Sequence, residues 1–395
     1  MSSAEEAPES YLAILASLPE PHEKDTTDNE RPMLTLLDAL AGICVSQAER
    51  EVYASAIATA PDSCTIFIIG NHEEVPQETQ DYLTDICQKL TGIAHLADTS
   101  GSRTQSIEDL PLQVRDSIGN VYRSVLLFTF AKFYTRLMKW DAMWTRRLKD
   151  ITHRLADEAD KKKFQDLADA LDTLHHLASD FRTGDADLLL EVLEAIAHNW
   201  KLRDPETAAF IKRADLLPTS DRTDVPFQVG RYLRKVLKTY NETTKLIRFV
   251  VSPRRGHIFR NQPKLVFLRS GKRRVELDIK TAVGTLKRQI DITDEDERFL
   301  DRFVDDAGVR FEEQYTCCPH CECAMLAALL QLWKMPQRPA PVVGISKLSC
   351  FGCRLYFTAY ENALRELPAS SLYLFYGNVS TPLNFRRLTC LSCLS

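Results

Sequence analysis

The sequence predicts an α+β protein, with an all-α domain over residues 31–216 followed by a domain over residues 226–380 in which helices and strands alternate. Two observations support this class. Apolar residues recur at three- and four-residue steps through most of the first half. In the second half, short β-branched runs alternate with such helical stripes and are separated by proline and glycine. Residues 1–30 are acidic and polar and are expected to form a disordered arm, and residues 381–395 form a cysteine-containing tail.

The composition is that of an ordinary globular protein, with 395 residues, 44% hydrophobic and 27% charged. A net charge of −5 argues against binding to polyanions by the whole chain. No apolar run approaches the ~20 residues of a membrane-spanning helix, and the acidic start does not resemble a signal peptide. The 11 cysteines show no disulfide spacing, which favours a reducing intracellular compartment, cytoplasmic or nuclear.

The first domain is predicted to be a helical scaffold or a partner-binding module, since it carries no catalytic motif. Pro32–Thr59 and Gln77–Ala94 have helical stripes. Thr65–Ile69 is either a short strand or the start of a buried helix. After a polar linker, the expected helices are Glu108–Asp116, Asn120–Leu148, Lys149–Phe181, Asp185–Lys201 and Pro205–Leu216.

A polar stretch, Leu217–Val225, marks the expected boundary between the domains, and Gln228–Val250 then reads as a helix. Ile258–Phe267 and Arg274–Ile279 are rich in β-formers and flank a turn, so a hairpin is expected to supply the first two strands of the core sheet. Residues 245–288 contain 13 lysines and arginines but only two acidic residues. This segment is either a face for RNA, DNA or another phosphate-bearing substrate, or an ordinary solvated hairpin.

The most informative stretch, residues 317–376, predicts the order helix, strand, helix, strand. Cys321–Trp333 is a helix with His320 and Glu322 at its first turn, and Val342–Ser346 is a buried strand. Ser349 caps a second helix, Cys350–Leu367, and Ser371–Tyr376 is the next strand.

Three metal ligands are therefore expected near two helix starts: His320, Cys350 and Cys353. Helix N-termini favour negative charge and stabilise thiolates. One imidazole and two thiolates leave a fourth zinc position open, as in catalytic rather than structural sites. The pattern H-x-E…C-x-x-C is typical of zinc-dependent base deaminases.

These residues resemble the cytidine deaminase-like superfamily, and more narrowly the fungal branch of the OTT-type deaminase-like family. That family carries a His-Cys-Glu helix start and a Ser-Lys-x-x-Cys-x-x-Cys segment, here His320–Glu322 and Ser346–Cys353. The resemblance implies a three-layer α/β/α domain that binds Zn2+ through His320, Cys350 and Cys353. It also implies zinc hydroxide as nucleophile and Glu322 as proton shuttle, in hydrolytic deamination of a cytosine- or adenine-type base in a nucleotide or nucleic acid.

Ser349 departs from the general superfamily pattern, in which a proline usually precedes the first cysteine. Two other observations leave alternatives open, and a third alternative is that the cysteines bind no metal. Cys318 and Cys321, with Cys350 and Cys353, also fit a four-cysteine zinc ribbon, although a helical run after Cys321 favours the catalytic arrangement. No convincing helix follows Tyr376, so the domain is expected to lack its last helix and strand. Cys390 and Cys393 are either a second metal half-site, an acylated tail or a frayed end.

The alternative function is a non-catalytic zinc module that binds a protein or nucleic acid on a helical scaffold. Arg260 and Asn261, close to the first expected strand, are predicted to contact substrate sugar or phosphate.

Overall fold

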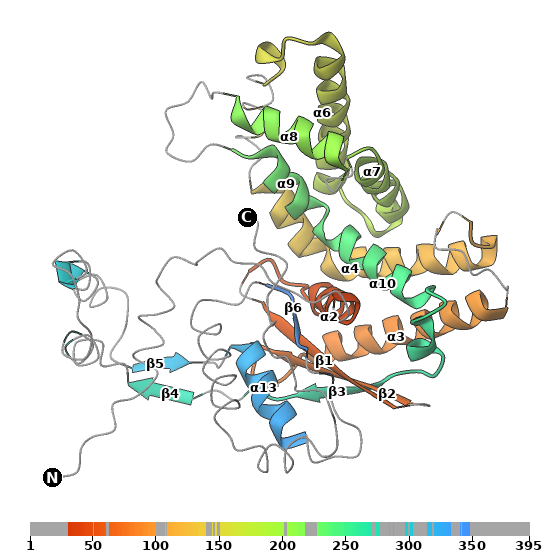
Figure 1. Cartoon of the computed structure of the whole chain (residues 1–395), viewed down its shortest axis with the longest axis vertical. Helices are drawn as coiled ribbons and strands as arrows, with labels where there is room; N and C mark the ends of the chain where they lie inside the picture. The colour runs from red at the N-terminus through yellow and green to blue at the C-terminus, as the bar shows by residue number, and fades with distance from the viewer. Residues whose placement is uncertain are drawn as a thin grey trace.

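The protein is built on a mixed four-stranded sheet with helices on both faces (Figure 1). This computed structural model describes residues 31–49, 51–60, 63–99, 107, 109–139, 144, 147, 151–200, 204–217, 227–270, 273–276, 284, 287, 297–298, 301–302, 314–317, 320–332, 340 and 342–347. The strand order is β3-β2-β1-β6. The strands are β1 (Tyr53–Ala60), β2 (Ser63–Gly70), β3 (Lys264–Leu268) and β6 (Gly344–Ile345).

Strand β1 runs antiparallel to both of its neighbours. Tyr53 pairs with Gly70 of β2, and Ala54 pairs with Ile345 of β6. Strand β3 is parallel to β2, with Ile69 opposite Leu268. The strands β2, β3 and β6 therefore all finish at the same end of the sheet, where β1 begins. We call this the Tyr53 end of the sheet.

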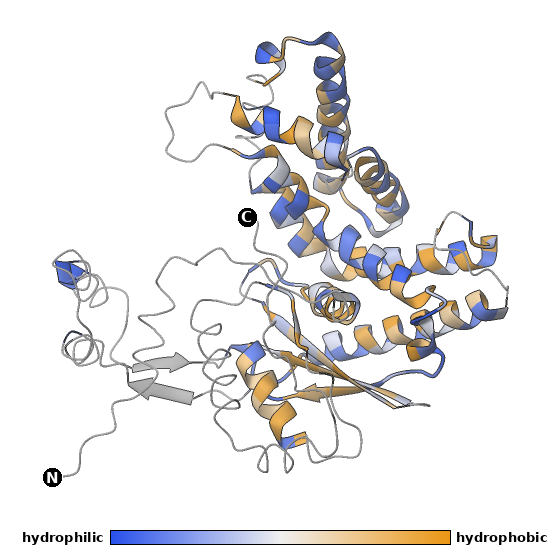
Figure 2. Cartoon of the chain, in the orientation of Figure 1, coloured by the Kyte–Doolittle hydropathy of each residue, from blue (hydrophilic) through white to orange (hydrophobic). Residues whose placement is uncertain are grey.

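Alternating residues of β1 and β2 pack against two different layers of helices. Tyr53, Ile57, Ile66 and Ile68 belong to one core cluster with α2 (Arg31–Ile43), α3 (Gln77–Thr99) and α10 (Lys238–Val250). Ala54, Ala56, Ala58, Phe67 and Ile69 belong to a second cluster with α13 (Cys321–Leu332) on the other face. Because side chains alternate along a strand, this division produces three layers. Figure 2 shows α13 as a largely hydrophobic helix with hydrophilic residues at its ends.

The remaining helices extend away from the sheet around a separate core. They are α6 (Glu158–Ser179), the 3-10 turn η1 (Thr183–Asp185), α7 (Ala186–Asn199), α8 (Pro205–Leu216) and α9 (Val229–Val236). Helix α4 (Leu112–Met138) links the two regions, since residues from Val114 to Val125 contribute to the sheet core and residues from Leu126 to Leu137 to the helical core. A short 3-10 turn, η2 (Gly256–Phe259), precedes β3, and β4 (Arg273–Glu276) pairs with β5 (Gln314–Cys317) in a separate ribbon.

The α+β class is confirmed, but the prediction that residues 31–216 are all helical is wrong. Residues 53–70 form β1 and β2, so that the central sheet takes strands from both predicted domains. The predicted hairpin after residue 258 is also wrong, because β3 pairs with β2 and β4 pairs with β5. The expected helices at α3, α8 and α13 and the strands at β2 and β6 are confirmed.

The predicted second zinc-site helix and the strand after it, residues 350–376, lie outside the described residues, as do residues 1–30 and 381–395. The domain boundaries at residues 217–226 therefore stay predictions. None of the helices in the described part of the chain is long and apolar enough to cross a membrane.

Candidate active site

The first turn of α13 holds two of the predicted site residues. The backbone N–H of Ala324 donates to the carbonyl of His320 at 3.0 Å, so the helix begins there as the sequence predicts. His320 is exposed, whereas Glu322 is buried, with an exposed fraction of 4%. A carboxylate in this turn lies beside N–H groups that have no partner within the helix, which favours its negative charge.

Helix α13 points this turn toward the Tyr53 end of the sheet. Its last residue, Leu332, is joined by a short link to Ala340, whose N–H donates to the carbonyl of Ile57 at 2.6 Å. The chain then runs through β6 to Ile345, opposite Ala54. The helix packs against β1 and β2, and Figure 1 shows its start on the side where β3 ends.

Cys321 is a buried thiol in the core between α13 and the sheet. It is 1% exposed, belongs to the α13 core cluster, and donates through Sγ to Glu322 Oε2 at 3.4 Å. Burial and the neighbouring Glu322 carboxylate raise the pKa of this thiol well above its ordinary value.

The strand that leads into the C-x-x-C segment is fixed from several sides. Tyr53 exchanges two hydrogen bonds with Ser346: its N–H donates to Ser346 Oγ at 2.8 Å, and Ser346 N–H donates to its carbonyl at 2.9 Å. Lys238 Nζ donates to the Ser346 carbonyl at 2.7 Å, and Asp38 Oδ1 accepts from Ile345 N–H at 2.9 Å. The chain is thus held at the Tyr53 end just before the segment of Cys350 and Cys353.

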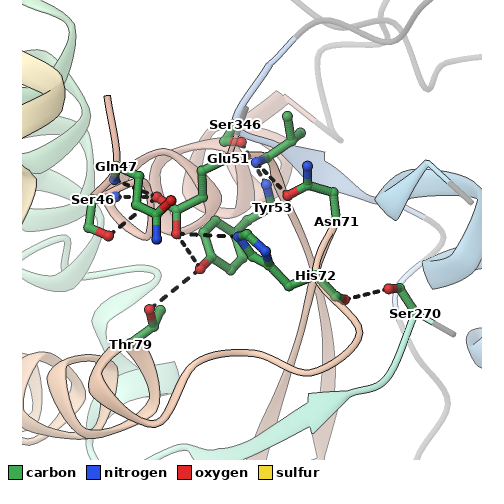
Figure 3. Close-up of polar contacts among 10 residues, drawn as sticks. Ser46, Gln47, Glu51, Tyr53, Asn71, His72, Thr79, Ser270 and Ser346 are labelled. Atoms are coloured by element: carbon green, nitrogen blue, oxygen red, sulfur yellow. Dashed lines mark hydrogen bonds and ion pairs between the residues drawn. The ribbon is translucent and has the colours of Figure 1, made fainter. Parts of the chain in front are cut away.

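A buried carboxylate, Glu51, organises the same end of the sheet (Figure 3). It is 4% exposed, and its Oε1 accepts from the Tyr53 hydroxyl at 2.7 Å. The His72 Nε2 atom is buried 3.8 Å from Oε1, beyond hydrogen-bond distance. Oε2 accepts the N–H groups of Ser46 and Gln47 at 2.6 and 2.7 Å. Glu51 therefore fixes the loop before β1 to the Tyr53 side chain, close to His72, which follows β2.

The sequence-based prediction missed this network, although one signal was present. The signal is that the polar residues Asn71 and His72 directly follow an apolar strand, since polar side chains often gather at the ends of strands. Asn71 exchanges two hydrogen bonds with Val52, its Oδ1 accepting at 3.0 Å and its N–H donating at 3.0 Å. The His72 carbonyl accepts from the Ser270 hydroxyl (Figure 3). Three strand ends are thereby tied together.

Arg260 and Asn261 lie elsewhere. They precede β3, whose first residue, Lys264, pairs with Thr65 near the start of β2. Arg260 Nε donates to Asp98 Oδ2 at 2.6 Å, near the end of α3. The structure therefore places both residues at the end of the sheet opposite the Tyr53 end and does not bring them to Glu322.

The described residues contain no group of three or more His, Cys, Asp and Glu side chains arranged to hold a metal ion. Of the predicted ligands, His320 is described, and Cys350 and Cys353 lie outside the described residues. The exposure of His320 beside the buried Glu322 fits a site that opens at the start of α13.

The comparison with known families concerns this same region. Residues 319–377 match the model of the OTT_1508-like deaminase family. We call them the deaminase-like segment. The match supports a deaminase activity in general, and a deaminase domain implies a nucleobase-type substrate. No curated protein and no solved structure was found to match the chain.

Proposed function

We propose that this protein is a zinc-dependent hydrolytic deaminase of a cytosine- or adenine-type base in a nucleotide or nucleic acid. The observation that supports this most is the buried Glu322 in the first turn of α13, beside the exposed His320, within the deaminase-like segment. The mixed sheet supports it further, because β6 leads to the C-x-x-C segment from the end toward which α13 points.

His320, Cys350 and Cys353 would hold the metal, which when bound would acidify a water molecule for attack on the amine-bearing ring carbon. Glu322 would accept a proton from that water and pass it to the ring nitrogen, and would then carry the second proton, from the added hydroxyl group, to the amino group so that it leaves as ammonia. The burial of Glu322 limits proton exchange between its carboxylate and bulk water, so the proton stays near the nucleobase. Cys321 orients the carboxylate through its S–H group.

The direct test is Glu322→Gln, assayed as ammonia release from cytidine, adenosine, their monophosphates and short single-stranded oligonucleotides. We expect deamination by the wild type on at least one of these and a loss of roughly 10²-fold or more in the variant. Glu49→Gln, at an exposed carboxylate, is the matched control and should retain activity. An active Glu322→Gln would contradict the mechanism, and a wild type that binds oligonucleotides without deaminating any would favour the non-catalytic alternative.

The zinc proposal has its own test, which requires no substrate. We expect His320→Ala to lose bound zinc and Cys318→Ser to keep it, measured by elemental analysis of the purified proteins. The reverse outcome would favour the four-cysteine ribbon. Circular dichroism of both variants would exclude unfolding as the cause of the loss.

A further inference from the structure

Two basic rows lie on neighbouring helices close to the Tyr53 end. The row on α4 and its C-cap is Lys132, Arg136 and Lys139, and the row on α9 and α10 is Arg231, Lys235 and Lys238, each at four- and three-residue steps. Such spacing places Lys132, Arg136 and Lys139 on one face of α4 and its C-cap, and Arg231 and Lys235 on one face of α9, while Lys238 is the first residue of α10. No aspartate or glutamate occurs in residues 117–140 or 225–241. We call these six residues, with Lys347, the cationic ridge.

The helices that carry the two rows are packed together. Phe133 and Leu137 of α4 share a core cluster with Leu233 and Val236 of α9. Arg136 Nη1 also donates to Thr239 Oγ1 on α10 at 3.2 Å. The two rows therefore lie side by side on a rigid support, with Lys139 exposed and the other five residues half-buried.

The ridge is joined to the candidate active site by two hydrogen bonds. Lys132 Nζ donates to the Ala48 carbonyl, in the loop that contains Glu51, at 2.6 Å. Lys238 Nζ donates to the carbonyl of Ser346, and the exposed Lys347 follows directly. The ridge thus leads to the point where the chain enters the C-x-x-C segment.

The positive charges of the ridge are close enough to oppose one another. Burial and the neighbouring Arg136 lower the pKa of Lys132, and Glu51 offsets part of this effect. Burial, Arg231 and Lys139 lower the pKa of Lys235. The buried carboxylates Glu51, Glu242 and Asp38 lie among the same cations and offset part of this repulsion, and an anion bound at the ridge would offset more of it.

We propose that the cationic ridge binds the phosphate backbone of a single-stranded nucleic acid and directs one of its bases toward Glu322. This inference rests on the proposed function and deepens it, because it assigns the substrate to polynucleotides rather than free nucleosides. A single strand is favoured over a duplex, since the amine of a paired base is inaccessible to a deaminase. Regularly spaced cations suit the regularly spaced phosphates of such a strand.

The second basic region of the chain provides a matched control. Arg254, Arg255 and Lys264 are exposed and belong to the segment that the sequence suggested as a nucleic-acid face. Lys264 pairs with Thr65, so this region lies away from the Tyr53 end. The two surfaces can therefore be compared within one protein.

The experiment measures binding of a fluorescent mixed-sequence DNA of about 12 nucleotides, and of the matching RNA, as a function of salt. All proteins carry Glu322→Gln, so that the bases stay unchanged. One variant adds Lys139→Gln, Lys235→Gln and Lys347→Gln. The control adds Arg254→Gln, Arg255→Gln and Lys264→Gln. Thermal unfolding of each protein checks the fold.

Loss of three phosphate contacts should reduce the slope of log affinity against log salt by about 2 and weaken binding about tenfold or more at 0.1 M salt. The control should retain the parent slope. An unchanged slope in the ridge variant, or an equal reduction in the control, would overturn the inference. So would equal competition by polyglutamate, which would indicate an acidic protein partner. Because binding is measured without turnover, these outcomes are independent of whether the wild type deaminates.

Discussion

At the scale of single residues, Glu51 shows how a buried charge is satisfied without a cationic partner at hydrogen-bond distance. Its carboxylate accepts two backbone N–H groups, the Ser46 hydroxyl and the Tyr53 hydroxyl. Hydrogen bonds to an ionised group are among the stronger ones, and an unsatisfied buried partner costs the full desolvation penalty. Glu51 therefore holds the loop before β1 in the conformation that presents Tyr53 to Ser346.

Glu51→Gln is expected to lower the free energy of unfolding by about 1–3 kcal/mol, because its single amide oxygen can replace only one carboxylate oxygen, the acceptor of the Ser46 and Gln47 N–H groups or the acceptor of the Tyr53 hydroxyl. Urea denaturation followed by circular dichroism measures this change. Glu49→Gln, exposed in the same loop, should alter stability by less than about 0.5 kcal/mol. Equal stability of the two variants would show that the network contributes little.

Asp38 makes the stability of the protein depend on pH. Desolvation, with a smaller contribution from Glu242, raises the pKa of its carboxyl from 3.8 to about 7, although the Ile345 N–H, Lys245 and Lys238 act in the opposite direction. A raised pKa means that the folded state binds the proton more tightly than the unfolded state. Asp38 therefore lowers stability progressively as the pH rises from 3.8 to about 7.

Asp38→Asn retains an oxygen that can accept from Ile345 but cannot ionise. We expect the variant to gain stability relative to the wild type as the pH rises from about 4 to about 7, as measured by urea denaturation at several pH values. A difference that is independent of pH would contradict the role assigned to this carboxyl. Asp81→Asn, on exposed α3 surface, supplies the comparison.

At the scale of elements, β1 shows why a sequence pattern can mislead. Alanine is the best helix former, so YASAIATA was expected to continue a helix. In the sheet, however, Ala54, Ala56 and Ala58 share one face and allow α13 to pack close, while Tyr53 and Ile57 fill the opposite face. The decisive period of two is visible in the sequence, but its partners β2 and β6 are not local, and propensity alone does not reveal them.

The parts of the candidate site that depend on neighbouring residues could be predicted from the sequence, and the parts that depend on the tertiary fold could not. His320 and Glu322 were assigned correctly to the start of a helix, because caps and stripes are short-range signals. Glu51, Tyr53 and Ser346 meet only through the tertiary fold. The substrate contacts proposed at Arg260 and Asn261 rested on closeness to a strand, and the register of β3 places that end of the strand away from Glu322.

Close packing of α2 against β6 gives a prediction at this scale. A Cβ atom at Gly344 would lie 2.2 Å from the Leu37 carbonyl carbon and 2.4 Å from the Asp38 nitrogen. Gly344→Ala must therefore displace the strand or the helix, and we expect it to lower the free energy of unfolding by roughly 2 kcal/mol or more. Gly92→Ala, in α3 with open space around it, should instead stabilise by about 0.5–1 kcal/mol. Urea denaturation of both variants measures the contrast.

At the scale of the whole molecule, the central sheet unites segments from both predicted domains. β1 and β2 come from the first, and β3 and β6 from the second. A fragment of residues 226–395 would leave Val343 and Ile345 without the alanine face of β1, and a fragment of residues 31–217 would leave β1 without β6.

We therefore expect neither fragment to fold alone, judged by the dispersion of amide signals in nuclear magnetic resonance spectra. Mixing or co-expressing the two fragments should restore dispersion. The full chain prepared in parallel is the control. A well-dispersed spectrum from residues 226–395 alone would contradict this view and support a boundary between residues 217 and 226.

The hydrogen bond from Tyr53 to Ser346 spans 293 residues of sequence. During synthesis on the ribosome, the side of β1 that pairs with β6 stays unpaired until Ser346 has emerged. An unpaired edge invites association with other chains, and contacts between such distant residues form slowly. The nascent protein should thus depend on chaperones over a long interval, and the candidate active site, which is assembled around β6, should form late.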